Sequence, residues 1–383
     1  MSAVKAGSTL ARLPLREDLV GKTPYGAPQL DVPVRLNTNE NSYDVPPDVV
    51  EAVVDAVRQE AAHLNRYPDR EFTALREDLA SYLGHHLAAE QLWAGNGSNE
   101  VILHLLQAFG GPGRIVLGFT PSYSMHPIIS MGTGSGWVDG LRGAEHDPFD
   151  LSVERALAQV EQHDPDVVFL CSPNNPTGTA LRLDVVEAVC AAARGMVVVD
   201  QAYAEFARPG TPSALTLLPG RERLVVTRTM SKAFALAGAR LGYLAADPAV
   251  CDALRLVRLP YHLSSLTQAA ARAALRHAEQ LLSTVEAIKA QRDRIVAAVA
   301  ALGLNPVDSD ANFVLFGGLA DEKATWQALL EHGVLIRDVG IAHHLRVTAG
   351  TPQETTAFLT ALAHSLPAPD QTPSTRQPSG EAR

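Results

Sequence analysis

The chain has 383 residues, which exceeds the usual length of one domain, so we expect roughly two domains. Hydrophobic residues make up 46% and charged residues 19% of the sequence, as in an ordinary folded protein. The 42 acidic residues outnumber the 32 basic ones and give a formal net charge of −10, and the basic residues are scattered. This balance argues against nucleic acid as a partner.

The cysteines Cys171, Cys190 and Cys251 lie far apart in apolar runs. This spacing is typical neither of a disulfide framework nor of a zinc site. His343 and His344 are adjacent and would point to opposite faces of an extended chain, so no metal site is expected there. The N-terminus lacks the apolar core of a signal peptide, and no later apolar run approaches the ~18 residues of a membrane span. The sequence therefore predicts a cytoplasmic protein outside the membrane.

The first predicted helix follows an irregular N-terminal arm. Asp48 and Glu51 resemble a capping box that opens this helix. Its expected apolar face consists of Val49, Val50, Val53, Val54 and Val57. A second helix is predicted near residues 73–83.

Between about residues 92 and 246, short apolar runs alternate with stretches long enough for helices. The runs are RIVLGF at 114–119, DVVFLC at 166–171, MVVVD at 196–200 and RLVVTRT at 223–229. Continuous apolar strands joined by helical crossovers indicate an α/β fold whose mostly parallel sheet is covered by helices on both faces.

The last third of the chain predicts a smaller α+β unit. Residues 266–303 are Ala-rich and helical, and the runs NFVLF, GVLIRD and LRVTAG begin at residues 312, 333 and 345. The segment from Pro367 is polar and rich in Pro and Ser, which predicts disorder. The expected parts are an arm (1–30), part of a small domain (31–60), a large ligand-binding domain (61–265), a small C-terminal domain (266–366) and a disordered tail (367–383).

Polar residues that follow the apolar runs are the first candidates for a site, because ligands bind beyond the carboxyl ends of such strands. AGNGSNEVILHLLQAF, residues 94–109, contains a glycine turn whose Ser98 can cap a helix that begins near Asn99. The free N–H groups and the dipole at that end favour a phosphate, although an ordinary capped helix is the alternative. CSPNNPTG, residues 171–178, offers amide side chains for a ligand or is a tight turn and nothing more.

Two further motifs carry charged groups. Asp200 ends the run MVVVD, where a carboxylate needs a cationic or N–H partner or else caps the next helix. In RTMSKAFALAGARLGY, residues 228–243, Lys232 stands in an apolar setting between Ser231 and Arg240. A desolvated lysine has a depressed pKa and can form a Schiff base, whereas a solvated lysine at a strand end is the alternative. A lysine, a carboxylate for a ring nitrogen and an arginine with a helix N-terminus together match the needs of pyridoxal phosphate.

On these motifs the sequence resembles the fold type I, aspartate aminotransferase-like enzymes. SKAFALAGARLGY together with TNEN near the N-terminus resembles their histidinol-phosphate aminotransferase branch, and the likeness extends over nearly the whole chain through NRYPD, TPSYSM and LIRD. It implies pyridoxal 5'-phosphate as cofactor, a ping-pong transfer of the amino group between histidinol phosphate and 2-oxoglutarate, and a homodimer with a shared active site. An aromatic amino-acid aminotransferase and a decarboxylase of the threonine-phosphate type share the same parts and stay open as alternatives.

The resemblance also implies residue roles. Lys232 would hold the cofactor as a Schiff base and Asp200 would pair with its ring nitrogen, while Tyr123 would stack on the ring. Asn175 and Tyr203 would bond the ring's phenolic oxygen. The phosphate would be surrounded by Ser98, Asn99, Thr229, Ser231, Arg240 and, from a second subunit, Tyr67. The groups near a substrate anion would be Arg346, Arg337, Tyr25 and Asn175.

Two places depart from the family pattern. Gln201 replaces the commoner Glu beside Asp200, but it only flanks the expected ring partner. The loop between Arg337 and Arg346 is short, which leaves the geometry of these two arginines open.

Overall fold

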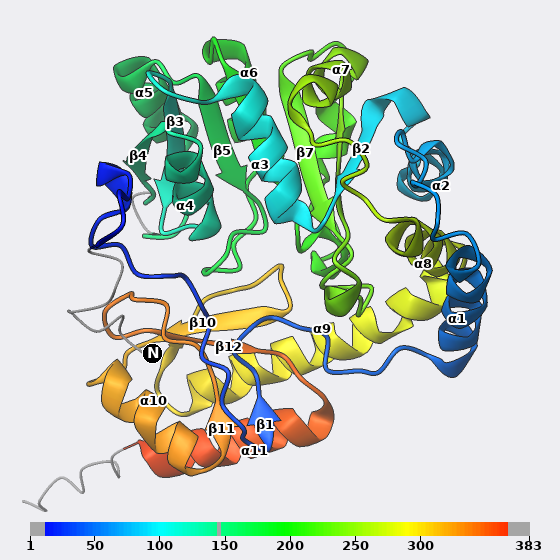
Figure 1. Cartoon of the computed structure of the whole chain (residues 1–383). Helices are drawn as coiled ribbons and strands as arrows, with labels where there is room; N and C mark the ends of the chain where they lie inside the picture. Colours follow the sequence, from blue (N-terminus) through cyan, green and yellow to red (C-terminus); the bar gives the residue numbers. More distant parts are fainter. Residues whose placement is uncertain (1–11, 144–146, 367–383) are drawn as a thin grey trace, which may run out of the picture.

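The computed structural model describes residues 12–143 and 147–366. A seven-stranded sheet forms the centre of the larger part of the molecule (Figure 1). In spatial order its strands are β2 (Leu92–Gly95), β8 (Gly242–Ala246), β7 (Leu224–Thr229), β6 (Met196–Asp200), β5 (Val167–Cys171), β3 (Ile115–Thr120) and β4 (Gly136–Leu141). The strands from β7 to β4 are parallel, whereas β8 runs antiparallel to β2 and β7. The predicted α/β fold with a mostly parallel sheet is confirmed.

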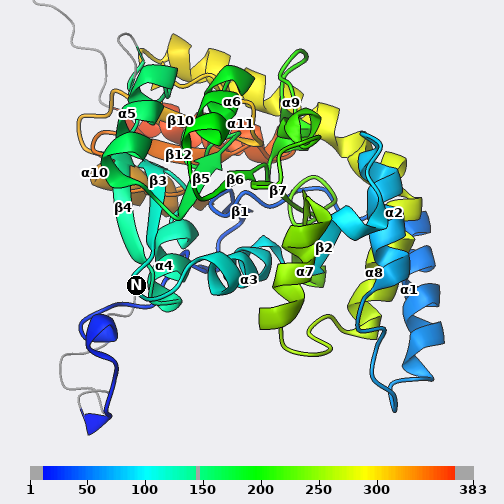
Figure 2. The same cartoon turned by 90° about the horizontal axis from the view of Figure 1, so that it is seen from above.

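The four apolar runs between residues 114 and 229 form β3, β5, β6 and β7. Every residue of β5, β6 and β7 is buried, as expected for strands covered on both faces. Helices α5 (Val153–His163) and α6 (Leu183–Ala192) cover one face of the sheet (Figure 2). The opposite face carries α3 (Ser98–Phe109), α4 (Met125–Gly132) and α7 (Pro248–Val257).

At the β2 end of the sheet, α1 (Pro47–Ala61) packs against α8 (Ser265–Arg276), beside α2 (Thr73–Leu83) (Figure 2). The predicted capping box at Asp48 is wrong, because α1 begins at Pro47 and no side chain caps it. Proline suits this position, since its φ is preset and the first N–H of a helix has no partner in any case. The predicted apolar face is only partly buried: Val49 is buried, but Val50 and Val54 are each 42% exposed.

The smaller part of the molecule lies beyond the carboxyl ends of the parallel strands (Figure 1). Its three-stranded sheet has the order β12 (Leu345–Thr348), β10 (Phe313–Gly317) and β9 (Asn305–Pro306). A separate parallel pair joins β1 (Val34–Arg35) to β11 (Val334–Leu335). The helices here are α9 (Ala278–Ala301), α10 (Glu322–Glu331) and α11 (Pro352–Ser365). The Ala-rich stretch is thus two helices, α8 and α9, separated at His277.

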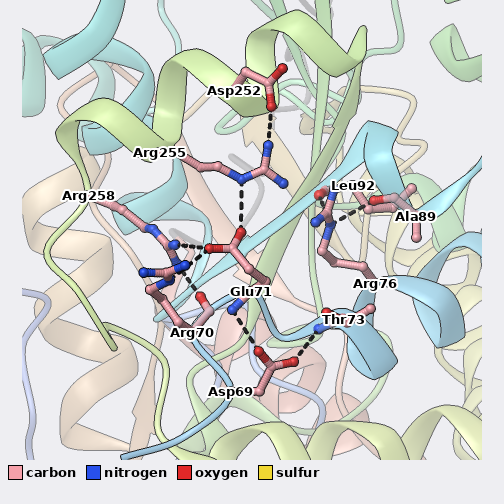
Figure 3. Close-up of polar contacts among 10 residues, drawn as sticks. All are labelled: Asp69, Arg70, Glu71, Thr73, Arg76, Ala89, Leu92, Asp252, Arg255 and Arg258. Carbon is pink, nitrogen blue, oxygen red and sulfur yellow. Dashed lines mark hydrogen bonds and ion pairs between the residues drawn. The ribbon is translucent and has the colours of Figure 1, made fainter.

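A polar network holds the start of α2 against α7 (Figure 3). Glu71 accepts from Arg255 Nε at 2.8 Å and from Arg258 Nη2 at 2.5 Å. Asp69 accepts from the backbone N–H groups of Glu71 and Thr73, at 2.9 and 2.8 Å. The network fixes the segment that directly follows the NRYPD motif.

Some predictions concern features at or beyond the limits of the described chain. Residues 1–11 of the predicted arm and the whole predicted tail, 367–383, lie outside the described residues. Within the described ranges, none of the helices combines the length and apolar character that crossing a membrane requires. In the same ranges, no three His, Cys, Asp or Glu side chains gather in a way that could hold a metal ion.

Candidate active site

A cavity of about 550 Å³ lies at the carboxyl ends of β5, β6 and β7, between the large sheet and the smaller part of the molecule. Every predicted site residue except Tyr67 lines it. These residues are Tyr25, Ser98, Asn99, Tyr123, Asn175, Asp200, Tyr203, Thr229, Ser231, Lys232, Arg240, Arg337 and Arg346.

Lys232 follows the end of β7 and is partly buried. Its Nζ donates a hydrogen bond to the carbonyl oxygen of Thr38 at 3.0 Å. Burial lowers the pKa of Lys232 to about 8, and the positive charges of Arg346 and Arg240 also lower it, while Glu40 opposes them. Because only the neutral amine is a nucleophile, this environment suits Lys232 to attack a carbonyl near neutral pH.

Asp200 ends β6 and is 2% exposed. Its Oδ1 accepts from Thr227 Oγ1 at 3.0 Å, and its Oδ2 lies 3.0 Å from His126 Nε2. The His126 ring stacks on Phe169 with 4.3 Å between ring centroids, and its Nδ1 is buried without a partner. The tautomer that carries its proton on Nε2 therefore fits the carboxylate. Asp200 does not cap a helix, since the 3-10 turn that follows has Tyr203 at its N-cap and no side-chain cap, and its carboxylate lines the cavity instead.

Sequence reasoning missed His126. It lies three residues after Tyr123, in the first turn of α4 and close behind the end of β3. Tyr123 is expected only from the family resemblance. The rule that polar residues after a buried strand are site candidates, applied to the run that forms β3 and extended by one helical turn, would have selected His126.

Tyr203 forms the centre of an amide cluster. Its hydroxyl accepts from Asn39 Nδ2 at 3.0 Å and from Asn175 Nδ2 at 3.3 Å. Burial raises the pKa of Tyr203 to about 12, so the phenol keeps its proton at neutral pH and can donate it to a ligand. Asn39, in the TNEN stretch, is a second residue that sequence reasoning did not single out.

Two arginines from the smaller part face the cavity together. Arg337 and Arg346 form an antiparallel backbone bridge with N···O distances of 3.0 and 2.9 Å, so their side chains leave the backbone on the same side. Arg346 is 6% exposed, donates to Asn175 Oδ1 at 2.5 Å, and keeps a buried Nε without a partner. The Arg337 guanidinium lies 5.9 Å from the centre of the Tyr25 ring. The short loop thus brings both cations to one wall, where they can bind an anion.

The N-terminus of α3 forms the opposite end of the cavity. The helix begins at Ser98 after Gly97 and has no side-chain cap, so the prediction that Ser98 caps a helix from Asn99 is wrong. Its first N–H groups are left available to an anion. Gly97 has φ +82°, and a Cβ there would lie 2.5 Å from Arg240 Nη2. This glycine therefore lets the arginine approach the helix end, where Thr229 Oγ1 also donates to Ser231 Oγ at 3.0 Å.

Tyr67 lies apart from this cavity. Its side chain is 79% exposed and stacks on Tyr261, with 4.4 Å between ring centroids and 12° between planes. It lines a separate cleft beside α1 and α8. Its expected action in a second subunit stays a prediction.

Comparisons with known proteins agree with this geometry. Residues 32–362 match the family model described as aminotransferase class I and II. The histidinol-phosphate aminotransferase of Paenarthrobacter aurescens (strain TC1) is 63% identical over 356 residues, which cover 92% of this chain and 95% of the relative. The protein of that name from Thermobifida fusca (strain YX) is 60% identical over 356 residues, 93% of this chain and 96% of the relative.

Solved structures show the same fold. The histidinol-phosphate aminotransferase from Sinorhizobium meliloti in complex with pyridoxal 5'-phosphate has a TM-score of 0.77 at 26% identity, and covers 87% of this chain and 91% of that one. The aspartate aminotransferase from Thermus thermophilus with maleate has a TM-score of 0.74 at 25% identity, over the same shares. From its sequence and its fold, the chain belongs to the class I and II aminotransferases and, within them, to the histidinol-phosphate aminotransferase family.

Proposed function

We propose that this protein is a pyridoxal-phosphate-dependent transaminase that moves the amino group between histidinol phosphate and 2-oxoglutarate. The observation that carries the proposal is the convergence of Lys232, Asp200 and Arg346 on one cavity. They supply an amine with a depressed pKa, an oriented carboxylate and a buried cation with an unused donor. Relatives named histidinol-phosphate aminotransferase at 54–63% identity favour this substrate over an aromatic amino acid, and favour transamination over decarboxylation.

The residues present fit pyridoxal 5'-phosphate. The uncapped N-terminus of α3 and the close approach of Arg240 to Gly97 suit its phosphate. In the proposed arrangement Lys232 holds the cofactor covalently, Asp200 pairs with the ring nitrogen and Tyr123 stacks on the ring. Asn175 and Tyr203 bond the phenolic oxygen, and the phosphate is bound by Ser98, Asn99, Thr229, Ser231 and Arg240.

When bound, pyridoxal phosphate supplies an electron-accepting ring that stabilises the charge left on the substrate's α-carbon. The Asp200 carboxylate, oriented by Thr227 and His126, keeps the ring nitrogen protonated and so maintains that capacity. Nζ of Lys232 would take the proton from the substrate's α-carbon as a general base and deliver it on the cofactor side as a general acid. The burial that lowers the pKa of Lys232 to about 8 in the cofactor-free protein favours the neutral amine that the first of these steps needs.

Arg346 and Arg337 bind the anionic group of each substrate in turn, with Tyr25 and Asn175 beside them. Histidinol phosphate has no α-carboxylate, so its phosphate is the group that arginines can hold. In the second half-reaction 2-oxoglutarate presents a carboxylate to the same site. A planar guanidinium can bond either anion through two N–H groups, which makes one site serve a ping-pong cycle.

The proposal includes a cytoplasmic homodimer in which Tyr67 reaches the cofactor phosphate of the partner subunit. Tyr67 is exposed and lies outside its own cavity. Leu64, three residues before Tyr67, is 54% exposed, and Leu259, two residues before the stacking partner Tyr261, is 76% exposed. A second copy of the chain that covers this surface would bury them and bring Tyr67 to its target.

The proposal is tested by assaying the purified enzyme with pyridoxal phosphate and 2-oxoglutarate against histidinol phosphate, phenylalanine and tyrosine. The reaction is followed by the glutamate formed, and kcat/KM should be highest with histidinol phosphate as the amino donor. A preference for phenylalanine would reject the substrate, and release of carbon dioxide in place of glutamate would indicate a decarboxylase.

A further inference from the structure

Residues 37–40, the tetrapeptide Asn-Thr-Asn-Glu, run along one wall of the cavity. The carbonyl of Asn37 accepts from Arg346 Nη2 at 2.9 Å, and the carbonyl of Thr38 accepts from Lys232 Nζ at 3.0 Å. The Thr38 hydroxyl in turn donates to Glu40 Oε2 at 2.8 Å. In chain order the wall therefore contacts the anion-binding arginine, the reactive amine and then a carboxylate.

Three carboxylates line this cavity within the described part of the chain, and Glu40 is the exposed one. Both oxygens of Asp200 are hydrogen-bonded. Asp338 Oδ1 accepts from the N–H of Gly340 at 2.8 Å, and Asp338 directly follows Arg337 in sequence, on the arginine side of the cavity. Glu40 Oε1 bonds to no residue of the described ranges, so Glu40 presents an unused acceptor on the wall that also contacts Lys232.

We propose that Glu40 recognises the donor substrate by accepting a hydrogen bond from its imidazole N–H, an inference that rests on the proposed function. Histidinol phosphate carries its amine on the carbon between a phosphate arm and an imidazole arm. With the phosphate at Arg346 and the amine at Lys232, the imidazole is directed to the side of the amine away from Arg346. The order of groups on the substrate then matches the order Arg346, Lys232, Glu40 along the wall.

The short reach of this wall supports the match. Residues 37 and 40 are three apart, and an extended chain advances at most ~3.6 Å per residue, so the segment spans no more than about 11 Å. Glu40 is also close enough to act on the amine. The pKa of Lys232 is lowered chiefly by burial and, to a smaller extent, by the charges of Arg346 and Arg240. The negative charge of Glu40 acts in the opposite direction and raises this pKa.

The chemistry of a carboxylate at this place discriminates among donors. A carboxylate only accepts hydrogen bonds, and imidazole donates one N–H when neutral and two when protonated. A phenyl ring has no donor, so it would desolvate Glu40 without replacing the lost water contacts. A second carboxylate of 2-oxoglutarate would meet a like charge there, which directs that group toward the arginines.

The test is Glu40→Gln, measured in separate half-reactions of the pyridoxal-phosphate-loaded enzyme. The matched donors are histidinol phosphate and phenylalaninol phosphate, which share the amine and the phosphate and differ in the ring. The substitution keeps an acceptor oxygen but removes its charge, so the hydrogen bond to the imidazole becomes a neutral one and kcat/KM for histidinol phosphate should fall about tenfold. Phenylalaninol phosphate should lose little, and 2-oxoglutarate should react with the amino form of the enzyme equally fast or faster.

The control is Asp44→Asn, which removes a negative charge from an exposed residue of the same segment outside the cavity, and should change none of the three rates. Glu40→Asp keeps the charge on a shorter stem and should give an intermediate loss confined to histidinol phosphate. Equal losses for the two phosphorylated donors would overturn the inference, because Glu40 would then act through Lys232 or the fold. If the wild-type enzyme does not transaminate histidinol phosphate, the proposed function itself is overturned.

Discussion

Replacing Arg346 with glutamine should raise the pH at which Lys232 becomes reactive. Lys232 has a pKa of about 8 in place of the usual 10.5. At ~1.36 kcal/mol per pKa unit, this difference corresponds to about 3 kcal/mol between the charged and neutral amine. It also gives about 300 times more neutral amine at pH 7 than an ordinary lysine has.

Burial is the largest cause of this lowered pKa and the charge of Arg346 is the next. Arg346→Gln should therefore raise the pKa of Lys232 by on the order of one unit while leaving it below the ordinary value. Arg337→Gln is the matched control, because Arg337 lies at the same wall but does not contribute to the lowered pKa of Lys232.

The assay follows the reaction of the cofactor-free protein with pyridoxal, an aldehyde without the phosphate, by absorbance across a pH series. Borohydride reduction and peptide mapping identify the lysine that reacted. The wild-type midpoint should lie near pH 8, move up in Arg346→Gln and stay in place in Arg337→Gln. A wild-type midpoint near the ordinary lysine value, or equal shifts in both variants, would refute the reasoning.

Four further outcomes are expected. The unfolded cofactor-free chain binds a proton on Lys232 up to pH ~10.5 and the folded chain only to about 8, so Lys232 contributes stability that rises with pH across this window. Burial raises the pKa of Cys171, Cys251 and Tyr203, which act in the opposite direction, so the contribution is measured as the difference between the wild type and Lys232→Met in urea unfolding. Lys232→Met should be more stable by about 3 kcal/mol at pH 7, and the difference should vanish toward pH ~10.5. Asp200→Asn should retain the cofactor but lose at least about tenfold in both kcat and kcat/KM, since it weakens a charge-assisted contact used in the transition state, and near-normal turnover would contradict the role of Asp200. Arg337→Ala should lower kcat/KM about ten- to hundredfold for histidinol phosphate and less for phenylalanine, whereas equal losses would reject Arg337 as the phosphate reader. Mixing inactive Lys232→Ala with weakened Tyr67→Phe protein should partly restore activity, because each mixed dimer has one site without either change; no gain despite verified subunit exchange would argue against a shared site.

The sequence was most informative where one physical requirement acts on a continuous stretch. A parallel strand buried on both faces must be apolar throughout, and MVVVD, which forms β6, satisfies this over its whole length up to Asp200. The polar residue at its end could therefore be assigned to the edge of the sheet where ligands bind. The same reasoning placed Lys232 after β7 and Asn175 after β5.

Contacts that depend on tertiary packing were beyond this reasoning. Asn39 bonds Tyr203 across 164 positions of sequence, and His126 bonds Asp200 across 74, so no local pattern marks either pair. Ser98 illustrates the opposite error, because its residue type favours a helix cap while the helix actually begins one position earlier. The local preference was overridden where Gly97 brings the helix end close to Arg240.

The structure also accounts for glutamine at position 201. Asp200 and Gln201 are consecutive at a strand end, so their side chains point to opposite faces of the sheet. On the face away from the cavity, Gln201 Oε1 accepts from Ser213 Oγ at 2.9 Å and from Arg228 Nη2 at 3.2 Å. Arg228 already pairs with Glu205 at 3.0 Å, and both side chains are less than 10% exposed. A glutamate at 201 would add a second buried negative charge to a pair that is already neutral, whereas glutamine supplies an acceptor without charge and leaves Asp200 undisturbed.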